Sequence, residues 1–406
     1  MNGFFQVEKR FYGKPGVNQT FLKFFLPHFR VHTTIIVEIQ GEVFITAASK
    51  MKAETRPPFF IIGCGRSGTT LLATVLNAHP DIDIPRADAL YDIYGPFVPI
   101  PAPEAELSDR QWRRLLNMLT SDVAVRNWEH PPQPSDLRLD HSRKSFSTAY
   151  RALHEFHART SGCCTWGAKM VGGEQRINRL LSDFPEAKFI YCLRDPRAVV
   201  QSLLETDFGP TNLWDATQQW AGSVRMWREA QRRYPDRHFL TLRYEDLVLN
   251  TGKSVAEVLH FLSVPWHPSV EAYHESEFAK ARALSPEHAN LSRRPDAALI
   301  DRWIEQMAPE KIARIEQILG DELLSQGYIL KGPPPSDVAR PKPRRYTLRE
   351  RARSVTQYLL TVIRSAAILF SSATIESGYI LFGRSDVIQE PRGHRRDHGQ
   401  ADGSRQ

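Results

Sequence analysis

Residues 59–80, FFIIGCGRSGTTLLATVLNAHP, form the stretch whose residue types point most directly to chemistry. Its three glycines allow a tight turn that brings backbone N–H groups close to an anion. The helix expected to follow adds the positive end of its dipole. A triphosphate-binding loop of pattern GxxxxGK[ST] would carry a lysine where this chain has Thr69, and Arg66 supplies charge instead. The stretch therefore predicts a loop that binds a smaller anion without a metal ion.

A second polar group follows the apolar run KFIYCL at 188–193. Arg194 comes directly after this expected strand, at the sheet edge where open α/β folds bind ligands. Asp195 can cap the next helix and Pro196 can open it, and Ser202 lies two turns further on. An arginine and a serine so placed predict a site for a second phosphate, although Arg194 can equally pair with Asp195.

A parallel sheet is needed to bring these residues together. Apolar runs typical of strands occur at 59–63, 163–170 and 188–193, and we expect a fourth strand within 238–247 that ends in a polar turn. Helical patterns separate them, at 69–78, 146–160, 177–187, 196–205, 213–233, 254–264 and 309–328. This alternation predicts an α/β protein, a P-loop-containing three-layer fold with a central parallel sheet flanked by helices.

The composition divides the chain into four parts. Residues 1–56 are expected to be an N-terminal extension with a weak hairpin pattern, and Met51 is an alternative start. Residues 57–330 hold the main domain. Residues 331–345 form a Pro/Arg-rich linker. Residues 346–406 are expected to be a basic extension, partly an amphipathic helix and partly disordered.

Charge, cysteine content and hydropathy limit the function classes. The net charge of +7 arises entirely after residue 330, so nothing in the main domain indicates a nucleic-acid partner. The four cysteines form no CxxC pair, which argues against a structural zinc site or a redox motif. We found no signal-peptide stretch and no apolar run of roughly 18 residues. We therefore expect a cytoplasmic location, with peripheral membrane contact through the basic C-terminal segment.

Taken together, FIIGCGRSGTTLL and FIYCLRDPRAVVQSLL resemble the two cofactor-binding signatures of the superfamily of sulfotransferases that use 3′-phosphoadenylyl sulfate (PAPS). The resemblance continues through WGAKM, RYEDLV, FLSVPW and DRWIEQMAPEKIARIEQILGDELLSQGY, and so covers about residues 57–330. It is greatest to the Golgi and bacterial branch that sulfates carbohydrates or tyrosines. The motifs are specific for the superfamily and say little about the acceptor.

The resemblance implies roles for individual residues. The first loop would cradle the 5′-phosphosulfate, and the strand-end arginine and the helix serine would bind the 3′-phosphate. Tyr244 would lie near the adenine, with simple packing as an equal alternative. Arg302 would contact the cofactor from a late helix, with Ser285 and Ser292 as weaker candidates. The implied cofactor-binding residues are Gly65, Arg66, Ser67, Gly68, Thr69, Thr70, Arg194, Ser202, Tyr244 and Arg302.

The implied reaction is a metal-free, in-line transfer of the sulfuryl group of PAPS to an acceptor hydroxyl. The acceptor would be a carbohydrate, lipid or peptide, and we expect a carbohydrate or glycoconjugate. Positioning and stabilisation of charge would carry catalysis, with Arg66 and Lys169 as the candidate cations.

The general base is where the sequence departs from the superfamily. Related enzymes often carry a glutamate at the position that Ala87 occupies here. Asp88, one residue further on, is the candidate base, although it also suits the cap of the helix expected next. The reserve candidates are Asp92, Glu174 and His141.

Two other functions fit parts of the pattern. A P-loop kinase of small molecules would need a lysine before Thr70 and an acidic magnesium ligand at a strand end, and we find neither in the sequence. A catalytically degenerate PAPS-binding protein or membrane-associated scaffold is favoured by Ala87 and by the basic tail. Sulfuryl transfer distinguishes the enzyme from both.

Overall fold

The computed structural model describes the backbone of residues 18–23, 33–39 and 42–47, and describes residues 56–85, 90–94, 106–140, 142–206 and 209–331. The chain divides into two compact units, Met1–Arg56 and Pro57–Gln406. The linker and extension expected at 331–345 and 346–406 lie outside the described residues, apart from Lys331.

The first unit contains a three-stranded antiparallel sheet of order β1-β2-β3. Its strands are β1 (Asn18–Lys23), β2 (Thr33–Ile39) and β3 (Glu42–Ala47). β2 and β3 form the hairpin that the weak alternation indicated.

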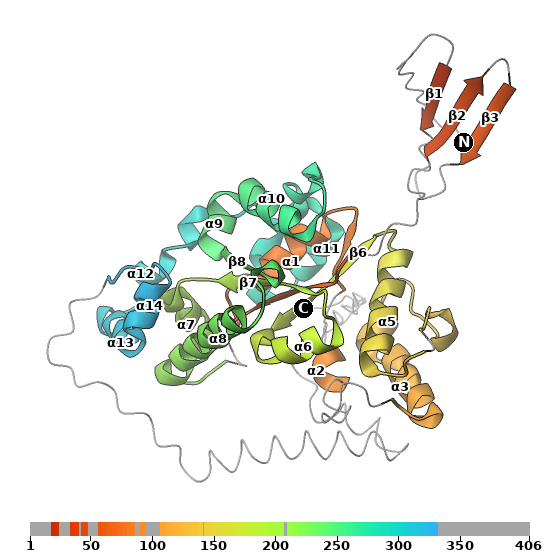
Figure 1. Ribbon diagram of the computed structural model, residues 1–406. Coiled ribbons are helices and arrows are strands. Elements are labelled where there is room, and N and C mark those ends of the chain that lie inside the picture. Colours follow the sequence, from red (N-terminus) through yellow and green to blue (C-terminus); the bar gives the residue numbers. More distant parts are fainter. Residues whose placement is uncertain are drawn as a thin grey trace, which may run out of the picture. The chain divides into compact units, whose positions relative to one another are not determined.

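The second unit is built around a five-stranded sheet of order β5-β6-β4-β7-β8, in which every pair of neighbours is parallel (Figure 1). The strands are β4 (Phe59–Gly63), β5 (Ile82–Asp83), β6 (Thr165–Val171), β7 (Lys188–Leu193) and β8 (Phe239–Arg243). Because the strands are parallel, their carboxyl ends meet at one edge. β4 lies in the centre, so the loop that follows it opens between the ends of β6 and β7.

Helices cover both faces of this sheet. One face carries α1 (Thr69–Asn77), α9 (Tyr244–Leu249), α10 (Thr251–Leu262) and α11 (Glu277–Arg282). The other face carries α2 (Leu90–Tyr94), α3 (Asp109–Ser121), α4 (Val123–Arg126), α5 (Phe146–Thr160), α6 (Ile177–Asp183), α7 (Pro196–Leu204), α8 (Leu213–Arg233), α12 (Arg302–Gln306), α13 (Pro309–Leu319) and α14 (Asp321–Ser325). The predicted three-layer α/β fold is confirmed.

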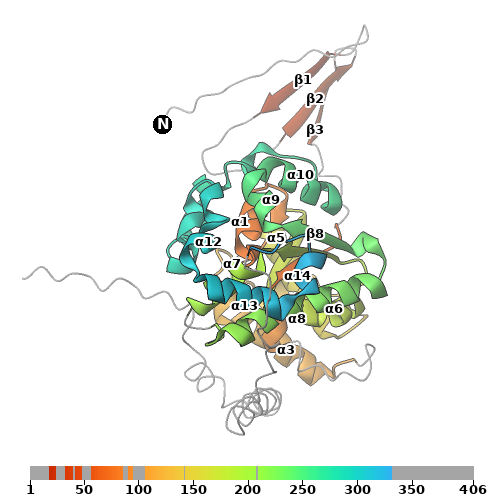
Figure 2. The ribbon, with the colours of Figure 1, turned by 90° about the vertical axis from the view of Figure 1, so that its left-hand side faces the viewer.

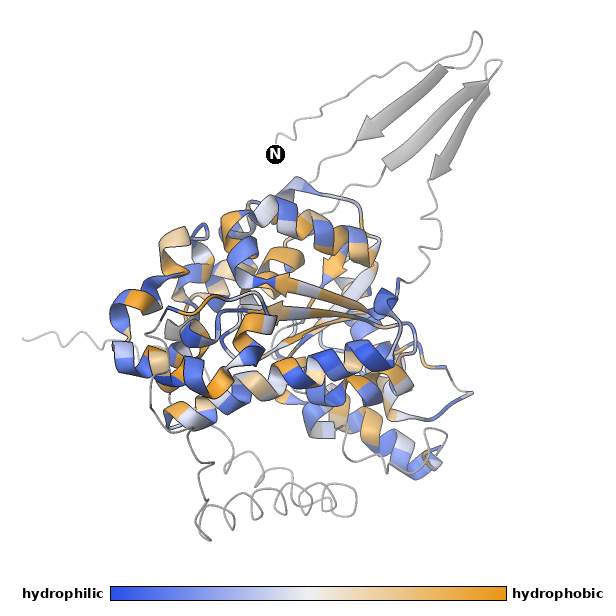
Figure 3. Cartoon of the chain, turned by 60° about the vertical axis from the view of Figure 1, so that its left-hand side comes forward, coloured by the Kyte–Doolittle hydropathy of each residue, from blue (hydrophilic) through white to orange (hydrophobic). Residues whose placement is uncertain are grey.

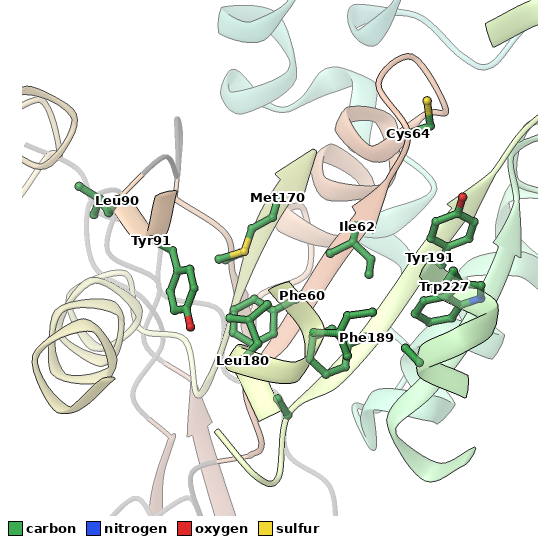
Figure 4. Packing of buried hydrophobic residues seen from close by; sticks show 14 of the residues in the cluster. Phe60, Ile62, Cys64, Leu90, Tyr91, Met170, Leu180, Phe189, Tyr191 and Trp227 are labelled. Carbon is green, nitrogen blue, oxygen red and sulfur yellow. The ribbon is translucent and has the colours of Figure 1, made fainter. Parts of the chain in front are cut away.

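Alternation along β4 separates two cores. Phe59 and Ile61 pack with α1 and α10, whereas Phe60 and Ile62 pack with α5, α6 and α8, and all four are fully buried. Figure 4 shows Phe60, Ile62 and Phe189 side by side in the second core. Figure 3 shows the apolar colour concentrated on the strands, with hydrophilic turns on the helices around them. The apolar strand runs thus reflect burial on both faces.

The structure also differs from the expected elements. The fourth strand ends at Arg243, and the residues expected to form a polar turn after it instead begin helix α9 at Tyr244. The helix expected at 309–328 is divided at Gly320, whose φ of 50° interrupts the helical backbone. The short strand β5 and the amphipathic helix α3 lie in a region where the sequence showed little pattern. Trp220 and Trp227, seven residues apart on α8, lie in the core with exposures of 0% and 2%.

Candidate active site

The loop between β4 and α1 has backbone angles and close contacts that are unfavourable for most residue types. Gly68 precedes α1 with φ 93°, and a Cβ at Gly68 would lie 2.5 Å from the ring of Tyr244. Arg66 also has a positive φ, 69°, which is uncommon outside glycine. A Cβ at Gly65 would come within 3.4 Å of Leu203. The loop is therefore tightly shaped, and such strain at a turn is typical of ligand-binding sites.

Hydrogen-bonding capacity within this loop is left unused. The side chain of Ser67 is 1% exposed, and its hydroxyl has no hydrogen-bond partner among the described residues. Thr69 is also buried and Thr70 half-buried, both in the first turn of α1. A buried hydroxyl without a partner costs free energy unless a ligand accepts its hydrogen bond. The loop is thus suited to an anion.

The structure joins the second predicted phosphate site to this loop. Arg194 lies at the end of β7, and one of its terminal N–H groups donates to the backbone carbonyl of Arg66 at 2.9 Å. The Nε of Arg66 donates in turn to the hydroxyl of Ser202 on α7, also at 2.9 Å. Residues more than 120 positions apart in the sequence therefore form one site.

Arg194 keeps further capacity for a ligand. Its guanidinium stacks on the ring of Tyr244 at 4.2 Å, and its buried Nε has no hydrogen-bond partner among the described residues. The alternative pairing with Asp195 is not seen, because Asp195 binds Arg197 and caps α7. Tyr244 thus contacts both Arg194 and the loop at Gly68.

Trp220 of α8 contacts the backbone of Arg194. Its indole N–H donates to the backbone carbonyl of Arg194 at 3.0 Å, and its side chain is fully buried. The sequence gave no sign of this polar contact. An indole that is buried needs a hydrogen-bond acceptor, and that requirement is the signal that could have indicated it.

Lys169 and Glu174 lie on opposite faces of the sheet near the same edge. Lys169, on β6, is half-buried and pairs in register with Ile61, which packs against α1. Glu174 follows β6 and is buried toward α8, where burial raises the pKa of its carboxyl more than a hydrogen bond from Ser223 lowers it. One oxygen of Glu174 is buried without a partner among the described residues. A raised pKa suits a general base, but at 6% exposure the Glu174 carboxyl has little access to an acceptor hydroxyl.

Of the remaining candidate bases, the structure describes Asp92 but neither Asp88 nor His141. Asp92 forms an ion pair with Arg176 at 2.8 Å, although burial raises the pKa of its carboxyl more than Arg176 lowers it. Asp88 and His141 lie outside the described residues, as does Ala87.

The late cofactor candidates are spread along the chain. Arg302 is exposed at the start of α12 and, in the described part of the chain, makes no hydrogen bond with the loop. Ser285 begins the 3₁₀ turns after α11, and Ser292 ends them with a hydrogen bond to Ala289. The structure thus brings together Arg66, Arg194, Ser202 and Tyr244 but not these three.

Within the described residues we find no group of side chains that could hold a metal ion. No described helix is long and apolar enough to cross a bilayer.

A glycine-rich loop between the central strand and its helix, joined to a strand-end arginine, defines a P-loop-type α/β protein. The profile of the sulfotransferase family matches residues 57–268. The chain belongs to this family and is a sulfotransferase enzyme, which confirms the resemblance seen in the sequence.

The chain is also similar to individual curated proteins and solved structures. Protein-tyrosine sulfotransferase 1 of Danio rerio is 26% identical over 306 residues, which cover 71% of this chain and 76% of the relative. Protein-tyrosine sulfotransferase 1 of Homo sapiens is 24% identical over 307 residues, covering 71% and 74%. Among solved structures, the sulfotransferase domain of the Synechococcus PCC 7002 olefin synthase is 18% identical, with a TM-score of 0.48 over 68% of this chain and 97% of that chain.

The relatives overturn one prediction. We expected a cytoplasmic location, but the curated relatives are protein-tyrosine sulfotransferases, which belong with the Golgi side of the branch named above. The expectation rested on the lack of a recognisable leader, and that lack says nothing about where the folded catalytic unit works.

Proposed function

We propose that this sulfotransferase uses PAPS as its donor and transfers the sulfuryl group to the hydroxyl of a tyrosine in a peptide or protein. The observation that supports PAPS as the sulfuryl donor is the contact of Arg66 with Ser202 and of Arg194 with the loop backbone. Two anion-binding groups that touch in this way match an adenosine that bears phosphates at both its 5′ and 3′ positions.

Unused donors support the fit of this nucleotide. The hydroxyl of Ser67 and the Nε of Arg194 are buried without partners among the described residues. Ser67 lies in the loop that would hold the 5′-phosphosulfate, and Arg194 lies at the strand end that would hold the 3′-phosphate. Tyr244, stacked on Arg194, offers an aromatic surface beside them. ATP would instead require the missing lysine and a magnesium ligand.

The reaction needs few covalent steps from the protein. The acceptor oxygen bonds to sulfur as the bond between sulfur and the 5′-phosphate oxygen breaks, and the acceptor proton passes to a base. Arg66 and Lys169 would stabilise charge on the transferring group and on the departing phosphate. We propose Asp88 as the base, because Asp92 is paired with Arg176 and Glu174 is buried.

The tyrosyl acceptor is favoured by the names of the relatives, which are protein-tyrosine sulfotransferases. The carbohydrate acceptor expected from the sequence has no comparable support, so glycans serve as the second arm of the test.

The decisive experiment combines binding and turnover. Calorimetry with adenosine 3′,5′-bisphosphate (PAP), AMP and ATP measures nucleotide preference, and labelled PAPS measures sulfate transfer to tyrosine peptides and to glycans. We expect PAP to bind more tightly than AMP or ATP, and label to reach the tyrosine peptides. Arg194→Glu should abolish the preference for PAP, since it places a negative charge at the expected 3′-phosphate position.

Each other outcome refutes a defined part of the proposal. Tighter binding of magnesium ATP than of PAP would refute the donor. Transfer to glycans but not to peptides would refute the acceptor. Binding of PAP without any transfer would leave a nucleotide-binding protein that has lost its chemistry.

A further inference from the structure

Arg197 forms a buried ionic network directly behind the strand-end arginine. It is 2% exposed and binds Asp195 through both carboxylate oxygens, at 2.9 and 2.7 Å. A third nitrogen donates to Glu316 of α13 and, at 2.9 Å, to the backbone carbonyl of Ile329. Trp303 covers the guanidinium at 4.3 Å. A buried guanidinium needs such ionic and hydrogen-bonding partners, because loss of a carboxylate partner would leave its charge uncompensated.

The peptide unit between Arg194 and Asp195 is held on both sides. Its carbonyl accepts the hydrogen bond from Trp220, and its N–H donates to one oxygen of Glu245 at 2.8 Å. Asp195 is held at the same time by Arg197. The backbone from which the Arg194 side chain projects therefore has little freedom to rotate.

The last described residues, Gln326–Lys331, form a C-terminal strap that closes this network. Tyr328 donates its hydroxyl to the second oxygen of Glu245 at 3.3 Å. Arg243 stacks on Tyr328 at 4.3 Å and donates to the first carbonyl of the strap at 2.6 Å. The last backbone N–H of the strap donates to Glu316 at 2.8 Å. Figures 1 and 2 both show α13 beside α7 and α8, the helices that this network connects.

The ionic partners of Arg197 keep it charged, whereas burial raises the pKa of the Glu245 carboxyl. Burial opposes the charge of Arg197, but its hydrogen bonds and ion pairs with Asp195 and Glu316 outweigh burial and raise its pKa. Burial, followed by the charge of Glu245, raises the pKa of the Tyr328 hydroxyl, so Tyr328 remains a hydrogen-bond donor.

We propose that the C-terminal strap, anchored by Glu245 and Glu316, positions Arg194 for the 3′-phosphate. The proposal rests on the proposed function and names residues that touch neither nucleotide nor acceptor. Glu245 fixes the peptide unit of Arg194 from one side, and Glu316 fixes Arg197 and through it Asp195. A guanidinium held in one direction loses less entropy when it binds a phosphate.

The test measures the contribution of the 3′-phosphate alone. AMP and PAP differ by that group, so the ratio of their Kd values reports on Arg194. In the full chain, Tyr328→Phe removes one hydrogen bond to Glu245 and Glu316→Gln removes one buried charge. We expect each variant to lower the preference for PAP about five- to tenfold, the ratio expected for the loss of about one hydrogen bond. The Kd for AMP should stay within about twofold.

Two further variants complete the experiment. Glu322→Gln removes a carboxylate from α14 that pairs with Arg225 at 3.8 Å, outside the network, and should leave the ratio unchanged. Arg197→Lys keeps a charge but cannot bind Asp195 through two nitrogens, and should fall between the wild type and Glu316→Gln.

The failures are distinguishable. If the wild type prefers PAP and both Tyr328→Phe and Glu316→Gln keep that preference, the positioning role is refuted and the proposed function stands. The same holds if these variants weaken AMP and PAP equally. If the wild type itself shows no preference for PAP, the proposed donor and this inference are both refuted.

Discussion

At the scale of single residues, the site combines satisfied and unsatisfied polar groups. Arg66 and Ser202 bind one another, while Ser67 and one nitrogen of Arg194 are buried without partners in the described chain. Unpartnered groups in native proteins usually have a ligand or a water molecule to satisfy them. The unpartnered groups of this site are therefore better indicators of the ligand position than the paired groups are.

Substitutions of Asp88 and Asp92 test the assignment of the general base. Asp88→Asn should lower kcat about 10²–10⁴-fold, because the amide cannot accept the acceptor proton. Asp92→Asn is the matched control, since Asp92 already pairs with Arg176. It should leave kcat within about threefold. Initial rates with labelled PAPS and a tyrosine peptide measure both, and PAP calorimetry verifies that binding is intact.

An equal loss in the two variants, or full activity of Asp88→Asn, would remove Asp88 from the mechanism.

At the scale of elements, helices α7 and α8 contact the residues that follow strands β4 and β7. α8 contributes the indole of Trp220 to the carbonyl of Arg194, and α7 contributes Ser202 to Arg66. α5 instead packs near the beginning of β6, where His154 contacts Tyr150 at 4.3 Å and Trp166 at 4.7 Å. The first two helices therefore shape the site, and α5 stabilises the sheet that carries it.

His154 makes the stability of this helix layer depend on pH. Burial, followed by the charge of His157, lowers the pKa of His154 from 6.5 to about 3. Between these values the unfolded chain binds a proton that the folded chain does not, so stability falls as the pH decreases. His154→Phe should remove this contribution, at most about 1.4 kcal/mol per pH unit.

Urea denaturation of both proteins at pH 7.5, 6 and 5 measures the effect. The difference in the free energy of unfolding, variant minus wild type, should increase toward pH 5. Parallel curves for the two proteins would show that His154 does not titrate differently on folding.

At the scale of the whole molecule, the chain consists of two compact units, and the family match begins at the first residues of the second. We therefore propose that residues 57–406 fold and bind nucleotide without residues 1–56. The chain without residues 1–56 should bind PAP within about twofold of the full chain and unfold in one cooperative transition. A shorter chain that begins at residue 64 loses β4, the central strand, and should not fold.

Calorimetry with PAP and thermal unfolding measure both truncations. A large loss of PAP affinity on removal of residues 1–56 would show that the first unit contributes to the site.

Much of the architecture could be predicted because parallel strands buried on both faces have an uninterrupted apolar pattern. The runs at 59–63 and 188–193 became β4 and β7, and the cap and proline at 195–196 open α7 as expected. Boundaries were less predictable. The polar residues after Arg243 suit a turn as well as the first turn of a helix, so the start of α9 was not predicted, and β5 is too short to show a period.

The sequence by itself determined the class of site, since a glycine-rich turn without lysine and an arginine after a buried strand are local features. Only the tertiary structure decided that Arg66 contacts Ser202 and Arg194, and that Arg197 rather than Arg194 pairs with Asp195. It also decided that the strap 326–331 contacts Glu245 and Arg197. Each of these contacts joins segments from different elements or selects between neighbouring partners. Packing of the helices on the sheet sets those distances, and no spacing along the chain encodes them.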